Sequence, residues 1–149
     1  MRAVVQRVSQ GKVEVNKDVV GEINKGLLIL LGVEKGDTTE DLQYIGDKIC
    51  NLRIFEDEKE KMNLSLKDID GELLIVPQFT LHGDARKGRR PSFINAENPE
   101  VAENYYEKLI ENCSKEIKKV QGGKFGADMK VHLINDGPVT ILLDSKKIF

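Results

Sequence analysis

Gly26-Leu27-Leu28-Ile29-Leu30-Leu31-Gly32-Val33 is the most apolar stretch of this 149-residue chain. Its near-continuous run of branched apolar side chains predicts a β-strand that is covered on both faces. The run is far shorter than the roughly 20 residues that a membrane-spanning helix needs. A second strongly apolar strand is predicted at Glu72–Val76, and it ends at Pro77 because proline has no backbone N–H to donate. The fold is therefore expected to be built around a buried sheet.

Shorter strands and two helices are expected on either side of these two strands. Turn residues and alternating apolar positions place the strands at Ala3–Val8, Lys12–Val15, Val19–Ile23, Arg53–Phe55, Met129–Ile134 and Val139–Leu143, with turns at Ser9–Gly11, Asn16–Asp18 and Asn135–Pro138. The first helix is expected to begin at Thr38 or Thr39 and to bury a stripe made of Leu42, Ile45, Ile49 and Leu52. The second helix should follow the N-cap Asn98, with Pro99 at its first position, and continue to Gly122-Gly123.

The order of these elements lacks the regular βαβ alternation of a doubly wound fold. It predicts an α+β fold, a curved mixed or largely antiparallel sheet packed with two main helices, in one domain that spans residues 1–149. Apolar residues make up 40% of the chain, which is enough for a core, and 23 Lys+Arg against 25 Asp+Glu give a net charge of −2. A chain-wide basic field for gripping nucleic acid is thus excluded.

The sequence also bears on the cellular location of the protein and on whether it binds a metal or cofactor. The N-terminal stretch Met1–Arg7 places Gln and Arg where a signal peptide needs an apolar run, so a cytoplasmic protein is expected. Cys50 and Cys113 are too few for a disulfide framework or a structural zinc site, and both fall on helical stripes as buried hydrophobes would. No cluster of residues has the spacing of metal ligands or of a phosphate loop, so we expect no metal and no cofactor.

The two histidines alone do not predict a catalytic site. His132 lies in an alternating strand, where a packing role is the favoured interpretation. His82 follows a strand end, but one histidine does not make a catalytic triad. No serine lies in a Gly-x-Ser-x-Gly elbow.

Two short segments have unusual backbone chemistry. In Val76-Pro77-Gln78-Phe79-Thr80-Leu81 the ladder should stop at the proline and leave the next N–H groups free to bind an oxyanion, with the Thr80 hydroxyl beside them. The alternative is a plain strand end with Phe79 in the core. In Asn135-Asp136-Gly137-Pro138-Val139-Thr140 the Gly-Pro pair predicts a sharp bend, for which a simple hairpin turn is the alternative.

A third segment is strongly basic. Arg86-Lys87-Gly88-Arg89-Arg90 carries four cations in five residues, with Phe93 close by. Such a block binds phosphates or simply stays solvated, and a neighbouring aromatic residue favours a nucleic-acid site. The residues alone leave both interpretations open.

Taken together, the chain resembles the D-aminoacyl-tRNA deacylase family from end to end. Six segments carry the resemblance in the family's order: Met1–Val8, Lys48–Phe55, Gln78–Leu81, Gly88–Phe93, Phe125–Met129 and Asn135–Thr140. Each segment is a weak signal alone, but six in the right order over the whole chain make a specific one.

The resemblance implies hydrolysis of the ester that joins a D-amino acid, or glycine, to the terminal adenosine of tRNA. It implies a homodimer in which a cis Gly137-Pro138 peptide enters the pocket of the neighbouring subunit and rejects L-amino acids, while the 2′-OH of the tRNA assists the chemistry. The implied site residues are Gln78, Phe79 and Thr80 for catalysis, Gly137 and Pro138 for chirality, and Arg7, Arg86, Lys87, Arg89, Arg90, Phe125 and Met129 for tRNA. The implied partners are tRNA and a second copy of the chain, with no membrane and no DNA.

One position departs from the family pattern. Pro77 stands where the family usually has serine, so a deacylase with relaxed chirality is one alternative. A tRNA-binding module without catalysis is another. A third is a small-molecule esterase with Thr80 as nucleophile and His82 as base, although residues two apart share a face on a strand and diverge at a bend.

Overall fold

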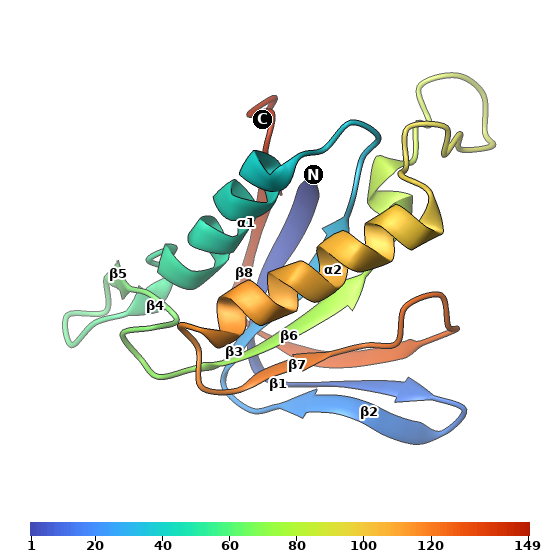
Figure 1. Cartoon of the computed structure of the whole chain (residues 1–149). Helices are drawn as coiled ribbons and strands as arrows, with labels where there is room; N and C mark the ends of the chain where they lie inside the picture. The colour runs from blue at the N-terminus through green and yellow to red at the C-terminus, as the bar shows by residue number, and fades with distance from the viewer.

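The apolar stretch that begins at Gly26 forms β3 (Gly26–Gly32), a strand at the centre of a strongly bent sheet (Figure 1). The computed structural model describes all residues 1–149. The other strands of this sheet are β1 (Arg2–Val15), β2 (Asp18–Ile23), β6 (Glu72–Pro77), β7 (Val120–Gly122) and β8 (Lys130–Asp144). Helices α1 (Thr39–Asn51) and α2 (Pro99–Ser114), a hairpin of β4 (Phe55–Glu56) and β5 (Met62–Leu64), and the 3₁₀ turn η1 (Phe79–His82) complete the chain.

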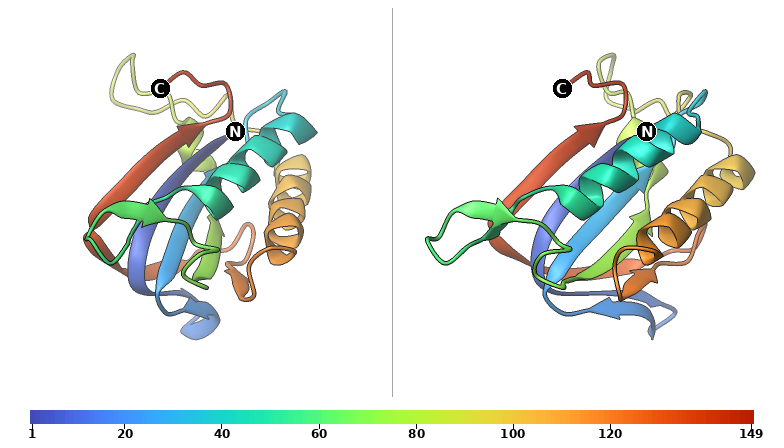
Figure 2. Two further views of the ribbon diagram at one scale, coloured as in Figure 1. Left: turned by 90° about the vertical axis from the view of Figure 1, so that its left-hand side faces the viewer. Right: turned by 60° about the vertical axis from the view of Figure 1, so that its left-hand side comes forward.

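The sheet is mixed, as predicted. Its strand order is β2-β1-β3-β6-β7, and β8 also pairs with β1. The β3–β6 and β6–β7 pairs are parallel, whereas β1 is antiparallel to β2, β3 and β8. The sheet curls until β2 returns against β7, where a Cβ on Gly21 would lie 2.3 Å from the carbonyl oxygen of Gly122. Both helices lie on one side of the sheet (Figure 2). The predicted α+β class with two main helices is confirmed.

Two expected turns are wrong, because long strands pass through them. No turn interrupts β1 at Ser9–Gly11; β1 bends there, pairing with β3 before the bend and with β2 after it. Asn135–Pro138 does not close a hairpin either, since both halves of β8 pair with β1 instead of with each other. Gln6 faces Thr140 and Val8 faces Asn135, so the four residues 136–139 bulge out opposite the single residue Arg7.

Two element boundaries and the packing expected for one residue also differ from the prediction. Helix α2 ends at Ser114, and Val120 lies in β7, where it pairs with Leu73 of β6. The strand expected at Arg53–Phe55 begins only at Phe55 and pairs with Leu64. His132 does not pack in the core. Its side chain is 49% exposed, and its Nε2 lies 3.4 Å from the carboxylate of Glu14.

Both helix starts follow the predicted capping chemistry. Asn98 Oδ1 accepts a hydrogen bond from the backbone N–H of Val101 at 3.1 Å. At α1, the backbone N–H of Thr38 donates to the Asp41 carboxylate at 2.7 Å. These bonds satisfy backbone donors that a helix start leaves open.

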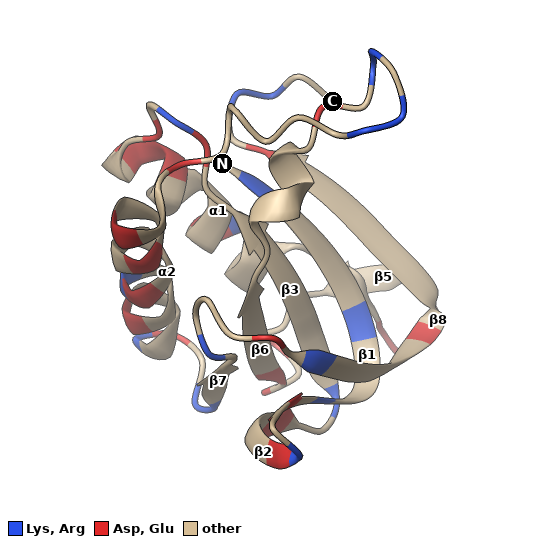
Figure 3. Cartoon of the chain, turned by 90° about the vertical axis from the view of Figure 1, so that its right-hand side faces the viewer, with Lys and Arg blue, Asp and Glu red and all other residues tan.

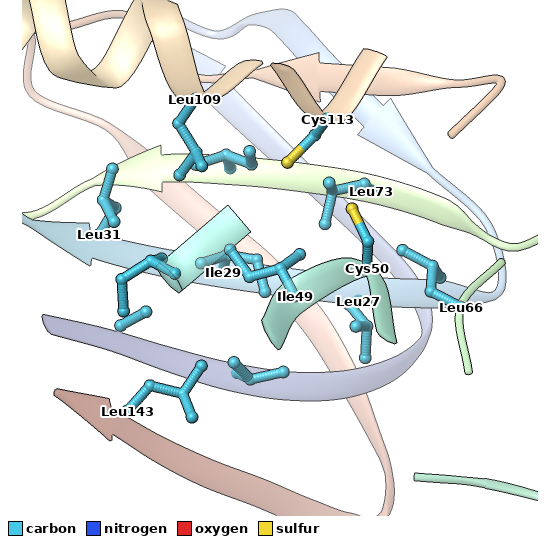
Figure 4. Packing of buried hydrophobic residues seen from close by; sticks show 14 of the residues in the cluster. Leu27, Ile29, Leu31, Ile49, Cys50, Leu66, Leu73, Leu109, Cys113 and Leu143 are labelled. Atoms are coloured by element: carbon cyan, nitrogen blue, oxygen red, sulfur yellow. The ribbon is translucent and has the colours of Figure 1, made fainter. Parts of the chain in front are cut away.

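The main core lies between the two helices and the sheet. Leu27, Ile29, Leu73, Ile49 and Leu109 are fully buried there (Figure 4). Cys50 of α1 and Cys113 of α2 are buried in the same layer, as predicted, and their sulfurs face one another. The hydrogen bond with Cys113, followed by burial, raises the pKa of the Cys50 thiol. The Cys50 thiol is therefore not a ready nucleophile.

The opposite face of the sheet is only partly covered. Inside the curl a smaller cluster, which includes Val8, Leu28 and Leu74, is buried. Outside the curled part of the sheet, Val4 of β1 pairs with Leu30 of β3 on one side and with Leu142 of β8 on the other, so the three residues form one row. No helix covers this row, and the Leu142 residue is 57% exposed.

A candidate active-site cleft at the end of the buried strands

Strand β6 ends as its proline predicts. The N–H of Gln78 donates to the carbonyl oxygen of Leu31 at 2.7 Å, and the chain then turns into η1. The N–H groups of Phe79 and Thr80 make no hydrogen bond within the chain. Phe79 is 57% exposed and meets Phe93 edge to face at a centroid distance of 5.2 Å. The alternative that placed Phe79 in the core is therefore wrong.

A cleft of about 820 Å³ opens beside this strand end. Four parts of the chain line it: the ends of β3 and β6 with η1, the loop that contains Phe93, the first turns of α2, and residues 125–131. Of the expected site residues it brings together Gln78, Phe79, Thr80, Phe125 and Met129. Among all lining residues only Glu97 and Asp128 carry a charge. The cleft therefore offers aromatic and apolar walls with free backbone donors at one end.

Sequence reasoning assigned no site role to several lining residues, among them Glu97, Ala102 and Tyr106. The apolar helical spacing of Ala102, Tyr105, Leu109 and Cys113 predicts Tyr105 as the core residue, and nothing in the pattern marks the adjacent Tyr106 as part of a cleft wall. In the structure Tyr106 is 5% exposed, whereas Tyr105 is only partly buried.

The Thr80 hydroxyl has no base beside it. Its Oγ1 accepts a hydrogen bond from Gln78 Nε2 at 3.0 Å. His82 is 3% exposed, and its Nε2 has no hydrogen-bond partner. Burial lowers the pKa of His82, a shift that the Gly32 carbonyl and Glu34 oppose. The Thr80–His82 pair that the esterase alternative requires is not formed.

The Gly137-Pro138 segment lies outside this cleft. The Gly137-Pro138 peptide bond is cis. Asn135 holds the bulge from its own strand, because its Oδ1 accepts the N–H of Val139 at 2.8 Å. Gly137 has a φ of +137°, and a Cβ there would lie 2.7 Å from Val139 Cγ2 and 3.1 Å from Arg7 Nη2. Only glycine fits this position without strain.

Arg7 supports the bulge from beneath. Its Nε donates to the carbonyl oxygen of Asp136 at 2.9 Å, and its Nη1 donates to that of Ile54 at 2.8 Å. The side chain is 8% exposed. The contact with tRNA expected for Arg7 does not fit this geometry, since Nε and Nη1 already donate to backbone carbonyls and Nη2 lies 3.9 Å from the Glu56 carboxylate. Arg7 instead orients the Asp136–Pro138 backbone.

The basic segment forms a closed, projecting loop. Asp84 and Ser92 exchange two backbone hydrogen bonds, of 2.8 and 2.9 Å, and residues 85–91 between them are exposed. Arg86 pairs with Asp84 at 2.6 Å, which lowers the pKa of the Asp84 carboxyl and raises that of Arg86. The other three cations, Lys87, Arg89 and Arg90, make no ion pair. Figure 3 shows the basic loop projecting from one end of the molecule.

Two further features bear on chemistry and location. No group of three or more His, Cys, Asp or Glu side chains is arranged so that it could hold a metal ion. None of the helices has both the length and the apolar character needed to cross a bilayer.

The chain is similar over its full length to known proteins. A protein from Clostridium botulinum (strain Loch Maree / Type A3) called D-aminoacyl-tRNA deacylase is 63% identical over 149 residues and covers all of both chains. One of the same name from Thermosipho africanus is 60% identical over the same length, again covering all of both chains.

Solved structures share the fold. The structure titled "c-Myc DNA Unwinding Element Binding Protein" is 43% identical, covers 97% of this chain and 98% of its own, and superposes with a TM-score of 0.92. A probable eukaryotic D-amino acid tRNA deacylase is 20% identical with a TM-score of 0.81, covering 95% of this chain and 97% of its own. The family model described as D-Tyr-tRNA(Tyr) deacylase matches residues 4–144. The chain therefore belongs to the D-Tyr-tRNA(Tyr) deacylase family.

Proposed function

We propose that this protein is an aminoacyl-tRNA editing hydrolase. It cleaves the ester of D-aminoacyl-tRNA, and of mischarged glycyl-tRNA, with water to give free tRNA and the free amino acid. The observation that carries the proposal is the cleft at the end of β6, where the family's Gln78-Phe79-Thr80 segment presents two unused backbone N–H groups. Full-length relatives that carry this activity in their names support the same reaction.

The cleft suits the end of an aminoacylated tRNA. Aromatic and apolar walls formed by Phe79, Phe93, Phe125 and Met129 can stack on a flat base such as the terminal adenine. A base held there places the attached ester close to the strand end. The chemistry of the lining, which is mostly uncharged, fits a nucleoside better than a free phosphate.

Backbone donors then stabilise the transition state. Attack of water on the ester carbonyl forms an oxyanion, and the free N–H groups of Phe79 and Thr80 can donate to it. The proton from water needs an acceptor, and no side chain beside Thr80 is placed to take it. The 2′-OH of the substrate ribose, adjacent to the ester oxygen, is the group that relays it to the ribose oxygen that departs when the ester bond breaks. The protein supplies position and charge stabilisation.

The basic loop binds the acceptor arm in this proposal. Lys87, Arg89 and Arg90 extend from a loop that two backbone hydrogen bonds hold closed, and none of them is neutralised by an acidic neighbour. Phosphates on the tRNA backbone are the natural partners of such cations. Arg86 shares its charge with Asp84 and contributes less.

A homodimer completes the site. Gly137 and Pro138 do not line the cleft of their own chain, so a second copy must bring them to it if they enforce chirality. The row Leu30–Val4–Leu142 on the uncovered sheet face supplies an apolar surface for that copy. A steric rejection of L side chains needs rigid walls, and the bulge held by Arg7 and Asn135 is rigid.

One experiment separates this proposal from its alternatives. The protein is incubated with D-aminoacyl-tRNA, with the L form, and with the D-amino acid methyl ester that lacks tRNA. Release from the D form alone supports the proposal. Equal release from both forms indicates relaxed chirality through Pro77. Binding without release indicates a tRNA-binding module, and cleavage of the methyl ester indicates an esterase.

A further inference from the structure

Two adjacent tyrosines on α2 make similar hydrogen bonds in different places. Tyr105 donates its hydroxyl to the carbonyl oxygen of Asp37 at 3.0 Å, away from the cleft. Tyr106 lines the cleft, donates to the carbonyl oxygen of Ile75 at 2.9 Å, and accepts the N–H of Gly123 at 2.9 Å. Only the Tyr106 hydroxyl thus joins two separate segments of backbone.

These two segments lead to opposite walls of the cleft. Ile75 lies in β6, whose continuation is the Gln78–Thr80 wall. Gly123 follows β7 and begins the segment that carries Phe125 and Met129, the facing wall. The Tyr106 ring also packs against Phe125 at a centroid distance of 6.0 Å. The hydroxyl therefore sits where the two walls diverge.

The position of the hydroxyl in the ladder explains how it acts. The N–H of Gly123 also donates directly to the carbonyl oxygen of Ile75 at 3.2 Å, a longer hydrogen bond that continues the β6–β7 pairing. The Tyr106 hydroxyl lies beside this bond and hydrogen-bonds to both of its groups. Gly122 makes room for it, because a Cβ there would lie 2.5 Å from the Tyr106 oxygen.

We infer that Tyr106 is a positioning residue whose hydroxyl sets the separation of the two cleft walls, and with it the affinity for the terminal nucleoside of the tRNA. This inference rests on the proposed function. Burial raises the pKa of Tyr106 to about 12, so the hydroxyl keeps its proton at neutral pH. Without the oxygen, the 3.2 Å hydrogen bond from the Gly123 N–H to the Ile75 carbonyl is the one bond left between the walls at this point, and the facing wall is held less firmly.

Tyr106→Phe tests the inference, with Tyr105→Phe as its matched control. Each variant removes one hydroxyl that donates to a backbone carbonyl, from neighbouring positions of one helix. Tyr106→Phe should raise KM for D-aminoacyl-tRNA about tenfold, with kcat changed less than about twofold, as loss of substrate positioning in the ground state predicts. Tyr105→Phe should leave KM and kcat unchanged. Equal KM values in the two variants would overturn the inference, as would a fall in kcat with KM unchanged.

Two further measurements keep the inference testable. Gly122→Ala displaces the hydroxyl without removing it and should reproduce the rise in KM, which guards against poor folding of Tyr106→Phe. Amide hydrogen exchange of residues 123–129 should be faster in Tyr106→Phe and unchanged in Tyr105→Phe. This readout does not need deacylase activity, so a wild-type protein without activity would refute the proposed function alone. Unchanged exchange in Tyr106→Phe would refute the wall-setting role.

Discussion

His82 is a buried imidazole whose titration should appear in the stability of the protein. Its Nε2 has no partner, and it faces Glu34, Arg2 and the α-amino group of Met1. Burial lowers its pKa in the folded state below the unfolded value of about 6.5. The unfolded chain therefore binds a proton first as the pH falls. The stabilising effect of the neutral ring is present above about pH 6.5 and is lost as the pH falls below it.

His82→Asn should remove this dependence, because asparagine keeps an N–H donor for the Gly32 carbonyl but does not titrate. We expect the wild-type Tm to fall more steeply than that of His82→Asn between about pH 7 and pH 5. Thermal unfolding across this range checks it. Parallel curves for the two proteins would show that His82 titrates alike in the folded and unfolded states.

Thr80 should not act as a covalent nucleophile. Its hydroxyl is bound by the Gln78 amide, and a hydroxyl of such high pKa needs an adjacent base to attack an ester. Thr80→Ala should keep turnover within about tenfold of wild type, the effect of one lost neutral hydrogen bond. Replacing the terminal 2′-OH of the tRNA by hydrogen should remove most activity. Complete loss in a folded Thr80→Ala protein that still binds tRNA would contradict this mechanism.

The basic loop should make the affinity for tRNA depend on salt concentration. Each phosphate contact releases counterions, so the logarithm of tRNA affinity falls linearly with the logarithm of salt concentration. Arg89→Gln with Arg90→Gln should weaken binding and reduce this slope by about 2. Arg86→Gln should change the slope less, because Asp84 already pairs with Arg86.

The β4–β5 hairpin supplies the control for this prediction. Lys59 and Lys61 are exposed on it, at the other end of the molecule from the basic loop (Figure 1). Lys59→Gln with Lys61→Gln removes the same charge and should leave the slope unchanged. Filter binding or fluorescence titration over a range of salt measures it. An equal slope for both double variants would mean that the loop cations remain solvated in the complex.

Local pattern predicted elements whose partners are close in sequence or whose ends carry strong signals. The strand at Gly26, the proline that ends β6 and the Asn98 cap are of this kind, because apolar runs, prolines and caps act locally. The long strands β1 and β8 were each split in two. Gly11 and Gly137-Pro138 are turn residues in most contexts. Here β1 and β8 continue through these residues because β1 pairs with three other strands.

The site also depends on contacts between segments that are far apart in the sequence, and no local pattern contains these contacts. The Phe125–Met129 segment meets Gln78–Thr80 because β7 pairs with β6 and curls the sheet. Family resemblance indicated these residues, but their shared cleft is visible only in the fold. Arg7 illustrates the opposite case. The family resemblance implied a tRNA contact for Arg7, and the curl buries this side chain under the Asp136 carbonyl instead.

The uncovered sheet face implies that two copies of the chain associate through it. Leu142 lies at the end of the row with Leu30 and Val4, and it is 57% exposed in the single chain. Leu142→Glu therefore costs little in an isolated subunit. At an interface the same carboxylate loses its water without gaining a partner, which costs about 3 kcal/mol or more and weakens association at least about a hundredfold.

Met62→Glu is the matched control, because Met62 is 47% exposed on the separate β4–β5 hairpin. Sedimentation should show a dimer for the wild type and Met62→Glu, and a monomer for Leu142→Glu at micromolar concentration. The monomer should also lose selective release from D-aminoacyl-tRNA, since Gly137 and Pro138 do not reach the cleft of their own chain. A Leu142→Glu dimer would place the interface elsewhere on the surface. A monomer that still distinguishes D from L substrates would instead mean that chirality is read within one subunit, by the cleft walls themselves.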